Sequence, residues 1–184
     1  MTAANNSRLE DPISTTQAAD PRESGTQLRS GLWHTINGRY PGSMIRKDGH
    51  IPLAKLKKQL PECKVSLVSS CGVHLKKDPP MDVSHPLGDF TFRHVPSHAK
   101  HADLVIHQIK YPHDDANRDI NVIFPIERLQ DLVMEKTIGS LTSNLFSFVG
   151  YNMDPERFEK TVAHDIAHEL VDKEHADAVL LAPA

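Results

Sequence analysis

The sequence has few cysteines, no long apolar run and no excess of positive charge. Only two of its 184 residues are cysteines, Cys63 and Cys71, and they lie at the start and just past the end of a predicted strand. A strand of this length is about 25 Å long, which is far more than a disulfide can span. We therefore expect two free thiols, a reducing compartment and a cytoplasmic location. No apolar run nears the roughly 20 residues that cross a bilayer, and the N-terminus lacks the regions of a secretory signal.

The net charge of −3 does not fit the basic surface that is typical of nucleic-acid-binding proteins. A chain of 184 residues is long enough for one ordinary domain with appendages. We expect a small-molecule substrate, and neither nucleic acid nor a membrane, as the partner; a homo-oligomer stays open. Twelve histidines are the unusual feature of the composition, and histidine is the side chain best suited to acid–base chemistry near neutral pH.

The character of the sequence changes after about residue 30. Residues 1–30 are polar and carry almost no aliphatic side chains, so they cannot bury enough apolar surface to fold, and we predict a disordered tail. Residues 31–61 form a predicted N-terminal arm, which ends in a short helix over residues 51–60 with leucines at helical spacing. The remainder, residues 62–184, forms the predicted α/β domain.

Within that domain, strand patterns alternate with helix patterns. Strands are predicted over residues 64–69, 89–95, 102–107, 145–149 and 178–181, and helices over residues 124–136 and 154–175. This alternation predicts an α/β protein with a mainly parallel sheet, in a three-layer Rossmann-like fold.

The first candidate site segment follows the strand over residues 64–69. Its members are Ser69, Ser70, Cys71, Gly72, His74 and Lys76. Glycine allows the backbone to approach a ligand closely, and the turn can supply backbone N–H donors to a developing negative charge. A nearby histidine and lysine would lower the pKa of the Cys71 thiol and make it a nucleophile. The alternative is an ordinary surface loop with a buried, inert thiol.

The second candidate site segment follows the strand over residues 102–107. Its members are His107, Lys110, Tyr111, His113 and Asp114, with Asn121 further along. Ligands of open α/β sheets bind outside the carboxyl ends of the strands, so two such loops meet at one edge if their strands belong to one parallel sheet. A solvated polar loop is the alternative here.

The predicted last helix carries the sequence His164-Asp165-Ile166-Ala167-His168, which is similar to the His-Glu-x-x-His pattern of zinc proteases. At about 100° per residue, the two histidines fall opposite the apolar face of the helix, which places them in solvent. We therefore predict no functional metal site there, although two histidines four residues apart can bind metal adventitiously.

Four segments of the sequence together resemble one protein family. They are residues 72–80 (Gly-Val-His-Leu-Lys-Lys-Asp-Pro-Pro), 119–129 (Asp-Ile-Asn-Val-Ile-Phe-Pro-Ile-Glu-Arg-Leu), 138–141 (Ile-Gly-Ser-Leu) and 177–181 (Asp-Ala-Val-Leu-Leu). In this order they resemble the selenoprotein B family of glycine, sarcosine, betaine and D-proline reductases, over residues 62 to 184. The resemblance implies an α/β fold and a small amine or amino-acid substrate. It also implies reductive cleavage of a C–N bond by a selenol or thiol that other thiol carriers regenerate.

The sequence departs from that family in two places. In relatives, the strand that matches residues 177–181 leads directly into a redox segment with selenocysteine or a Cys-x-x-Cys pair, whereas this sequence reads Leu181-Ala182-Pro183-Ala184. We therefore expect the family's redox group to have no counterpart in the sequence. Lys110 and Pro112 also stand where the resemblance implies a histidine and an aspartate.

The leading hypothesis is consequently acid–base chemistry without a redox step, as in an isomerase, cyclase, dehydratase or lyase of a biosynthetic route. His107 and His113 would act as acid and base, with Asp114 orienting one of them. Lys76, Arg93 and Lys110 would bind a carboxylate or an enolate.

Two alternatives to that hypothesis stay open. One is a thiol-dependent reductase of the family's type, with Cys71 as its redox centre, and the other is a non-catalytic accessory subunit. We expect no cofactor, although a metal-assisted variant with His74, His107 or His113 as ligands is also compatible with the sequence.

Overall fold

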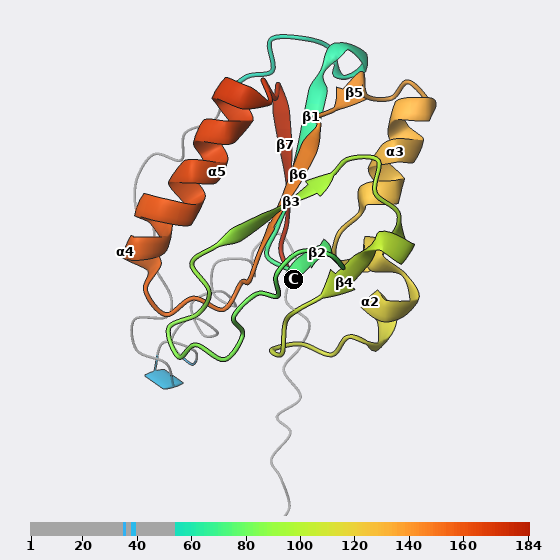
Figure 1. Ribbon diagram of the computed structural model, residues 1–184. Coiled ribbons are helices and arrows are strands. Elements are labelled where there is room, and N and C mark those ends of the chain that lie inside the picture. The colour runs from blue at the N-terminus through green and yellow to red at the C-terminus, as the bar shows by residue number, and fades with distance from the viewer. Residues whose placement is uncertain (1–34, 36–37, 40–53) are drawn as a thin grey trace, which may run out of the picture. The chain divides into compact units, whose positions relative to one another are not determined.

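A computed structural model describes Thr35, Gly38, Arg39 and residues 54–184 (Figure 1). Backbone contacts divide the chain into two units, Met1–Asp48 and Gly49–Ala184. The three described residues of the first unit are helical and exposed. The predicted tail and most of the predicted arm lie outside the described residues. None of the helices that the structure describes is long and apolar enough to cross a membrane.

The second unit is built around strand β1 (Lys64–Ser69). On one side β1 pairs along its length with β7 (Ala178–Ala182), and on the other it pairs first with β5 (Ser140–Leu141) and then with β6 (Asn144–Phe148), all in parallel. Strand β3 (Phe92–Pro96) adds to β6 in the antiparallel direction. Because both faces of the sheet are covered, nearly every residue of β1 is buried, and its pattern is a continuous run rather than an alternation.

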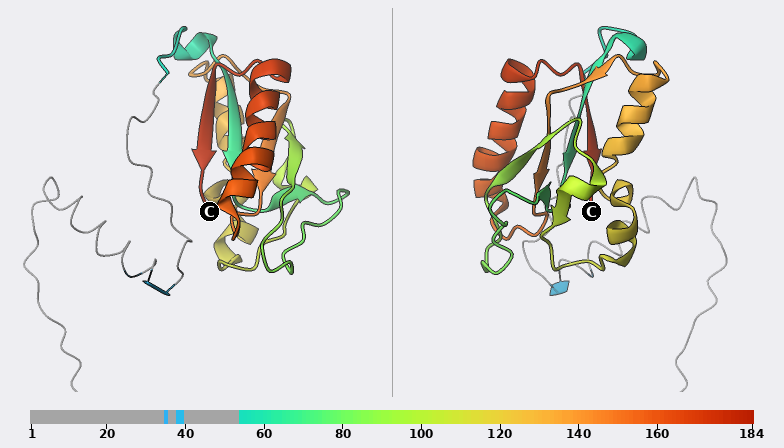
Figure 2. Two further views of the ribbon diagram at one scale, coloured as in Figure 1. Left: turned by 90° about the vertical axis from the view of Figure 1, so that its left-hand side faces the viewer. Right: turned by 45° about the vertical axis from the view of Figure 1, so that its right-hand side comes forward.

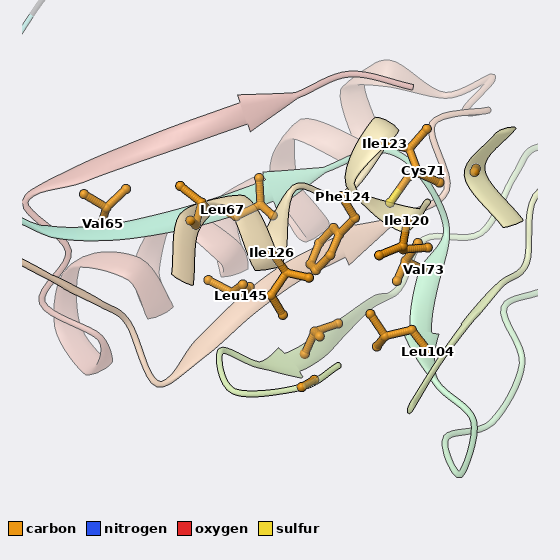
Figure 3. Packing of buried hydrophobic residues seen from close by; sticks show 14 of the residues in the cluster. Val65, Leu67, Cys71, Val73, Leu104, Ile120, Ile123, Phe124, Ile126 and Leu145 are labelled. Carbon is orange, nitrogen blue, oxygen red and sulfur yellow. The ribbon is translucent and has the colours of Figure 1, made fainter. Parts of the chain in front are cut away.

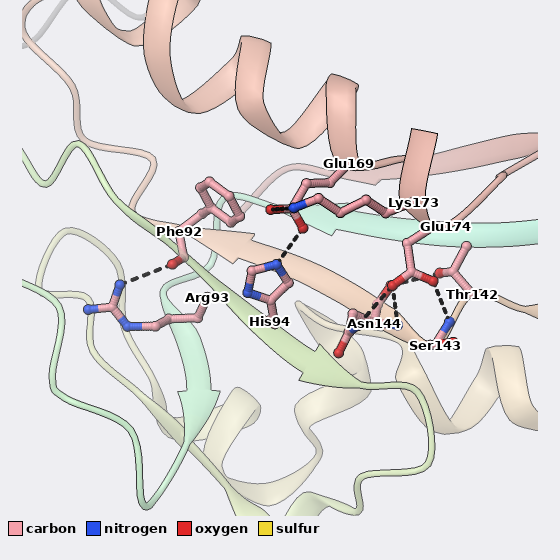
Figure 4. Close-up of polar contacts among 9 residues, drawn as sticks. All are labelled: Phe92, Arg93, His94, Thr142, Ser143, Asn144, Glu169, Lys173 and Glu174. Carbon is pink, nitrogen blue, oxygen red and sulfur yellow. Dashed lines mark hydrogen bonds and ion pairs between the residues drawn. The ribbon is translucent and has the colours of Figure 1, made fainter. Parts of the chain in front are cut away.

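A continuous helical segment covers one face of the sheet. It consists of α4 (Pro155–Phe158), the π-helical η4 (Glu159–Ala163), α5 (His164–His168) and the π-helical η5 (Glu169–Lys173). Asp154 caps its start by accepting a hydrogen bond from the backbone N–H of Arg157. Its apolar side packs Val162 and Ile166 against the sheet. Farther along, Glu169 accepts a 2.6 Å hydrogen bond from His94 of β3, which ties the helix to the edge of the sheet (Figure 4).

The other face of the sheet is covered by α3 (Ile126–Met134), the 3₁₀ turn η3 (Ile120–Val122) and the short helix α2 (Asp114–Arg118). Phe124 and Ile126 are fully buried there against Leu67 and Leu145 of the sheet (Figure 3). The amide of Asn121 caps α3, since its Oδ1 accepts a 2.9 Å hydrogen bond from the backbone N–H of Glu127.

A second, two-stranded sheet lies after β1 in the chain. Strand β2 (Val73–Leu75) pairs in the antiparallel direction with β4 (Leu104–Ile106), which follows the 3₁₀ turn η2 (His101–Asp103). The strand predicted over residues 102–107 forms as β4, but it pairs with β2 in this ribbon and not with a strand of the main parallel sheet. The reason is Gly72, whose φ of +70° turns the chain directly after β1 so that a new strand begins where we predicted a loop.

One other element differs from its prediction. The helix predicted over residues 51–60 does not form over its described part, because residues 54–59 are irregular and only a 3₁₀ turn, η1 (Leu60–Glu62), follows. The helices over 124–136 and 154–175 and the strands over 64–69, 145–149 and 178–181 are confirmed within a few residues. The fold is thus α/β with a mostly parallel sheet and a small antiparallel one (Figures 1 and 2). A Rossmann-like three-layer arrangement stays a prediction.

Candidate functional site

The loop after β1 lies at the carboxyl edge of the parallel strands. The carbonyl of Ser70 accepts a 3.0 Å hydrogen bond from the N–H of Gly150, which follows β6. The hydroxyl of the same serine accepts a 3.0 Å hydrogen bond from the backbone N–H of Ala184, just past β7. The residues that follow β1, β6 and β7 therefore lie next to one another at this edge, which is where ligands of α/β sheets bind.

Two histidines form a close pair beside this edge. His74 Nε2 and His107 Nδ1 are 2.5 Å apart, and the two rings are nearly coplanar, at 10° to one another. His74 Nδ1 donates to the carbonyl of Leu75 at 2.8 Å, so in the neutral ring Nε2 is the acceptor and His107 Nδ1 must donate to it. This leaves His107 Nε2, which has no hydrogen-bond partner among the described residues, free to accept a proton.

The histidine pair is held by the antiparallel ribbon. Val73 is paired with Ile106 across β2 and β4, and the N–H of His107 donates to the carbonyl of Gly72 at 2.8 Å. A side chain at Gly72 would put its Cβ 2.3 Å from the carbonyl oxygen of His107, so only glycine permits this approach. His74 is almost fully buried, and burial lowers the pKa of its ring below the usual 6.5. The neutral form of His74 is therefore favoured at pH 7.

Tyr111 connects the second segment to the first. Its hydroxyl donates a 2.8 Å hydrogen bond to the carbonyl of Cys71, and burial raises the pKa of its phenol. The ring of His113 contacts the ring of Tyr111 edge-on, with the ring centres 4.8 Å apart. Lys110 directly precedes Tyr111 in the sequence, and its ammonium lies 4.3 Å above the ring of Tyr151.

Two buried nitrogens near this edge have no hydrogen-bond partner among the residues described. They are Nε2 of His113 and Nδ2 of Asn152, and the latter residue lies four positions past the end of β6. A buried polar atom without a partner is costly unless something else satisfies it, which makes both atoms candidates for ligand contacts. Sequence analysis did not single out Asn152, and nothing in its local pattern distinguishes it from an ordinary loop residue.

Cys71 is a structural residue in this conformation. Its side chain is fully buried among Ile120, Ile123 and Phe124 (Figure 3), and its sulfur lies 3.6 Å from the hydroxyl of Ser147. Burial raises the pKa of the Cys71 thiol, which is the opposite of the activation that its histidine and lysine neighbours in sequence suggested. Cys63 is buried as well, and both cysteines are free thiols.

Several predicted site residues lie elsewhere or are engaged in structural hydrogen bonds. Ser69 donates its hydroxyl to the carbonyl of Ile123 at 2.9 Å, Asn121 caps α3, and Arg93 reaches the carbonyls of the prolines at positions 79 and 80 (side chain in Figure 4). The N–H of Gly72 is not a free donor, because it binds the carbonyl of Phe148 at 2.8 Å. Lys76 is exposed at the far end of β2 from Gly72, and Asp114 is exposed at the start of α2.

The histidines of the last helix face solvent, as predicted. The side chains of His164 and His168 are 67% and 60% exposed, and His168 pairs with Asp172 at 3.1 Å. Among the described residues, no group of three or more histidine, cysteine or carboxylate side chains is placed to hold a metal ion.

Comparison with known proteins assigns the family. Residues 39–184 match the family described as glycine/sarcosine/betaine reductase selenoprotein B. This chain belongs to that family. It is 36% identical over 124 residues to the D-proline reductase subunit gamma of Acetoanaerobium sticklandii, an alignment that covers 67% of this chain and 50% of the relative. The chain thus spans about half the length of the curated relative that it matches, and no solved structure matches it.

Membership of the selenoprotein B family bears directly on the hypotheses drawn from the sequence. The matched proteins carry the names of reductases, so the comparisons favour the reductase alternative over an isomerase, cyclase, dehydratase or lyase. The relative is named as a subunit, which points to protein partners in that protein. The comparisons give no support to a biosynthetic role.

Proposed function

We propose that this chain is a subunit of a reductase of the glycine, sarcosine, betaine or D-proline type, and that its substrate binds at the carboxyl edge of β1, β6 and β7. The observation that carries the proposal is the hydrogen bond from Ala184 to Ser70, because it brings the residues after β7 to this edge. The resemblance to the family implies a redox segment directly after the strand that corresponds to β7. A selenol or thiol arriving there would meet a substrate held beside the histidine pair.

The reaction that fits this arrangement is reductive cleavage of a C–N bond. The bond between carbon and nitrogen breaks, and the carbon and the nitrogen each gain a hydrogen. The amine then leaves, except in D-proline, where the ring opens and the nitrogen stays attached through its other carbon. The two electrons come from two thiols, or from a selenol and a thiol, which are oxidised to a disulfide or a selenosulfide. His107 Nε2 is the group that would exchange protons with the departing amine, while His74 fixes the orientation and tautomer of its ring.

Nδ2 of Asn152 and the imidazole of His113 suit the opposite end of such a substrate. An amide N–H and an imidazole N–H are hydrogen-bond donors, and the substrates that the family name implies all carry a carboxylate. Binding a carboxylate would satisfy the two nitrogens that have no partner in the described part of the chain.

Cys71 is the second candidate for the redox group, and two observations argue for a different thiol or selenol. The Cys71 side chain is fully buried, and its thiol has a raised pKa, so little thiolate is present at neutral pH. We therefore propose that the redox group comes from the segment that the resemblance implies after β7, or from a partner protein, as in a subunit of a larger assembly.

Binding measurements test this function without requiring turnover. We expect D-proline, glycine, sarcosine or betaine, titrated into the ¹⁵N-labelled full chain, to shift the amide resonances of Ser70, Gly72 and His107. Asn152→Ala should weaken that binding about tenfold or more, because a hydrogen bond to a charged group is lost. Asn117→Ala is the matched control, since Asn117 is exposed on α2 and should leave the affinity unchanged.

Two results would overturn the proposal. If none of the four compounds shifts resonances at this edge at millimolar concentration, the edge does not bind the family's substrates. If the purified chain with dithiothreitol cleaves the C–N bond of one of them, and Cys71→Ser abolishes this cleavage, then Cys71 is itself the redox centre.

A further inference from the structure

Two hollows lie around the turn that follows β3, near the amino edge of the main sheet. Each has a volume of about 360 Å³, and they share His98, which follows β3. The register of the strands locates them. Pro96 at the end of β3 is paired with Asn144 at the start of β6, and Leu141 of β5 is paired with Val65 near the start of β1. The hollows therefore adjoin the ends at which the parallel strands begin, whereas Ser70 and Ala184 lie where they finish.

The first hollow carries unpaired positive charge. Lys76 and Lys77 line it together with His98, and none of these three side chains has a hydrogen bond or an ion pair with any described residue. One carboxylate, that of Asp103, also lines it, but its Oδ2 accepts a 3.0 Å hydrogen bond from the backbone N–H of Lys100. With two ammonium groups against one carboxylate, the hollow favours a negatively charged group.

The second hollow is mainly apolar. Val133 of α3 and Leu141 of β5 supply its apolar wall. Lys100 also lines it, but its ammonium group is held at 2.8 Å by Oε1 of Gln130, so the lysine contributes mostly its hydrocarbon stem.

The turn over residues 97–99, which lies between the two hollows, is held in place by hydrogen bonds to its backbone. The N–H of Ser97 donates to the carbonyl of Ser143 at 3.0 Å. Nε2 of Gln130 donates to the carbonyls of Ser97 and Ala99, at 2.7 and 3.2 Å. The turn that carries His98 is thus fixed before any ligand arrives, which reduces the entropy that binding must overcome.

We propose that the two hollows form one binding site for a small amphiphilic anion, with a carboxylate or phosphate head against Lys76, Lys77 and His98 and a short hydrocarbon tail against Val133 and Leu141. The volumes fall in the range of about 300–1,000 Å³ that is typical of small-molecule sites. The first hollow adjoins the end of the β2–β4 ribbon that carries Leu75, but neither hollow is lined by a residue of the proposed substrate site, so the two proposals can be tested separately.

Titration with simple probes tests the proposal on the full chain. We expect hexanoate or hexyl phosphate to shift the amide resonances of Lys77, His98 and Val133, and acetate and inorganic phosphate to bind at least about tenfold more weakly because they lack the tail. The stronger of the two hexyl compounds identifies the head group. Hexylamine is the control for the charge and should not bind.

Charge-reversing variants locate the site. Lys76→Glu combined with Lys77→Glu should weaken binding of the hexyl anion more than tenfold, whereas Lys160→Glu, on the helix that covers the opposite face of the sheet, should not change it. Lys77→Gln, which removes one charge without adding another, should give a smaller loss. Equal binding of hexylamine, equal binding of acetate and hexanoate, or unchanged affinity in the double variant would each overturn the proposal.

Discussion

The buried polar groups at the two edges of the main sheet differ in whether they have hydrogen-bond partners. At the amino edge, the buried carboxylate of Glu174 accepts hydrogen bonds from the N–H groups of Ser143 and Asn144 and from the side-chain amide of Asn144, at 2.7, 3.1 and 2.8 Å (Figure 4). The hydroxyl of Thr142 is likewise satisfied, by Ser66 and by the carbonyl of Asn144. At the carboxyl edge, Nε2 of His113 and Nδ2 of Asn152 are buried and have no partner among the described residues.

This difference suggests that the polar groups at the amino edge stabilise the fold, whereas those at the carboxyl edge bind a ligand. A buried polar group whose hydrogen bonds are all made stabilises the fold when the alternative is an unsatisfied partner. A buried polar group without a partner reduces stability, and such groups are tolerated mainly where a ligand will meet them. Substitutions at the Glu174 cluster should therefore affect folding, whereas substitutions at the two unpartnered nitrogens should chiefly affect binding.

The largest expected effect comes from the glycine at the carboxyl edge. Gly72→Ala forces an L-residue to a φ of +70° and places its Cβ 2.3 Å from the carbonyl oxygen of His107. We expect a loss of roughly 4 kcal/mol in the free energy of unfolding, from the unfavourable backbone conformation and from the displaced ribbon. Urea denaturation measures the loss. Gly38→Ala is the matched control, because its added Cβ would meet no atom within 4 Å, and a loss of similar size there would contradict the explanation.

The next effect belongs to the amino edge. Glu174→Ala leaves the N–H groups of Ser143 and Asn144 without an acceptor, and we expect the protein to lose about 3 kcal/mol of stability. Glu174→Gln keeps one acceptor oxygen and should lose about half as much. Asn152→Ala, which removes an unpartnered nitrogen at the other edge, should cost less than either in the same urea denaturation assay. A larger loss for Asn152→Ala would reverse the contrast between the edges.

The smallest effect is a pH dependence at the histidine pair. Burial lowers the pKa of His74 in the folded chain below 6.5, so the unfolded chain binds this proton more readily. The contribution of His74 to stability is therefore fully present above pH 6.5 and is lost as the pH falls through the lower, folded pKa. Urea denaturation between pH 7.5 and 5 should show this loss as a fall in the free energy of unfolding.

His74→Phe keeps the ring volume and removes the titrating nitrogen, so it should flatten the dependence on pH over this range. His85→Phe serves as the control, because His85 is exposed in the loop before β3. A dependence on pH that survives in His74→Phe would show that another group causes it.

The elements with many residues of clear periodicity could be predicted from the sequence. Helix α3 shows its buried Ile126 and Leu129 at helical spacing, and Pro155 and Asp154 mark the start of the last helical segment. Strand β1 is recognisable because both its faces are buried. By contrast, β2 and β4 have three residues each and β5 has two, and such short strands show no periodicity that a sequence pattern could reveal.

The geometry of the candidate site depends on the β2–β4 ribbon, which the sequence did not predict. The two polar segments do meet, but an antiparallel pairing of β2 with β4 brings them together, not two neighbouring parallel strands. His74 and His107 are 33 positions apart, and only the register of the ribbon places their rings in contact. The burial of Cys71 was equally hidden, because it results from Ile120, Ile123 and Phe124, which lie about fifty positions away in the sequence.

The parallel pairing of β1 with β7 has a consequence for biosynthesis of the chain. The N–H of Lys64 binds the carboxylate of Asp177, 113 positions later, and β7 covers one entire side of β1. During translation, β1 emerges from the ribosome early and keeps that side unpaired until residues 178–182 have also left the exit tunnel. The central strand therefore completes its pairing only after residues 178–182 have been made, and until then the backbone N–H and C=O groups along that side can pair with another strand, which favours aggregation.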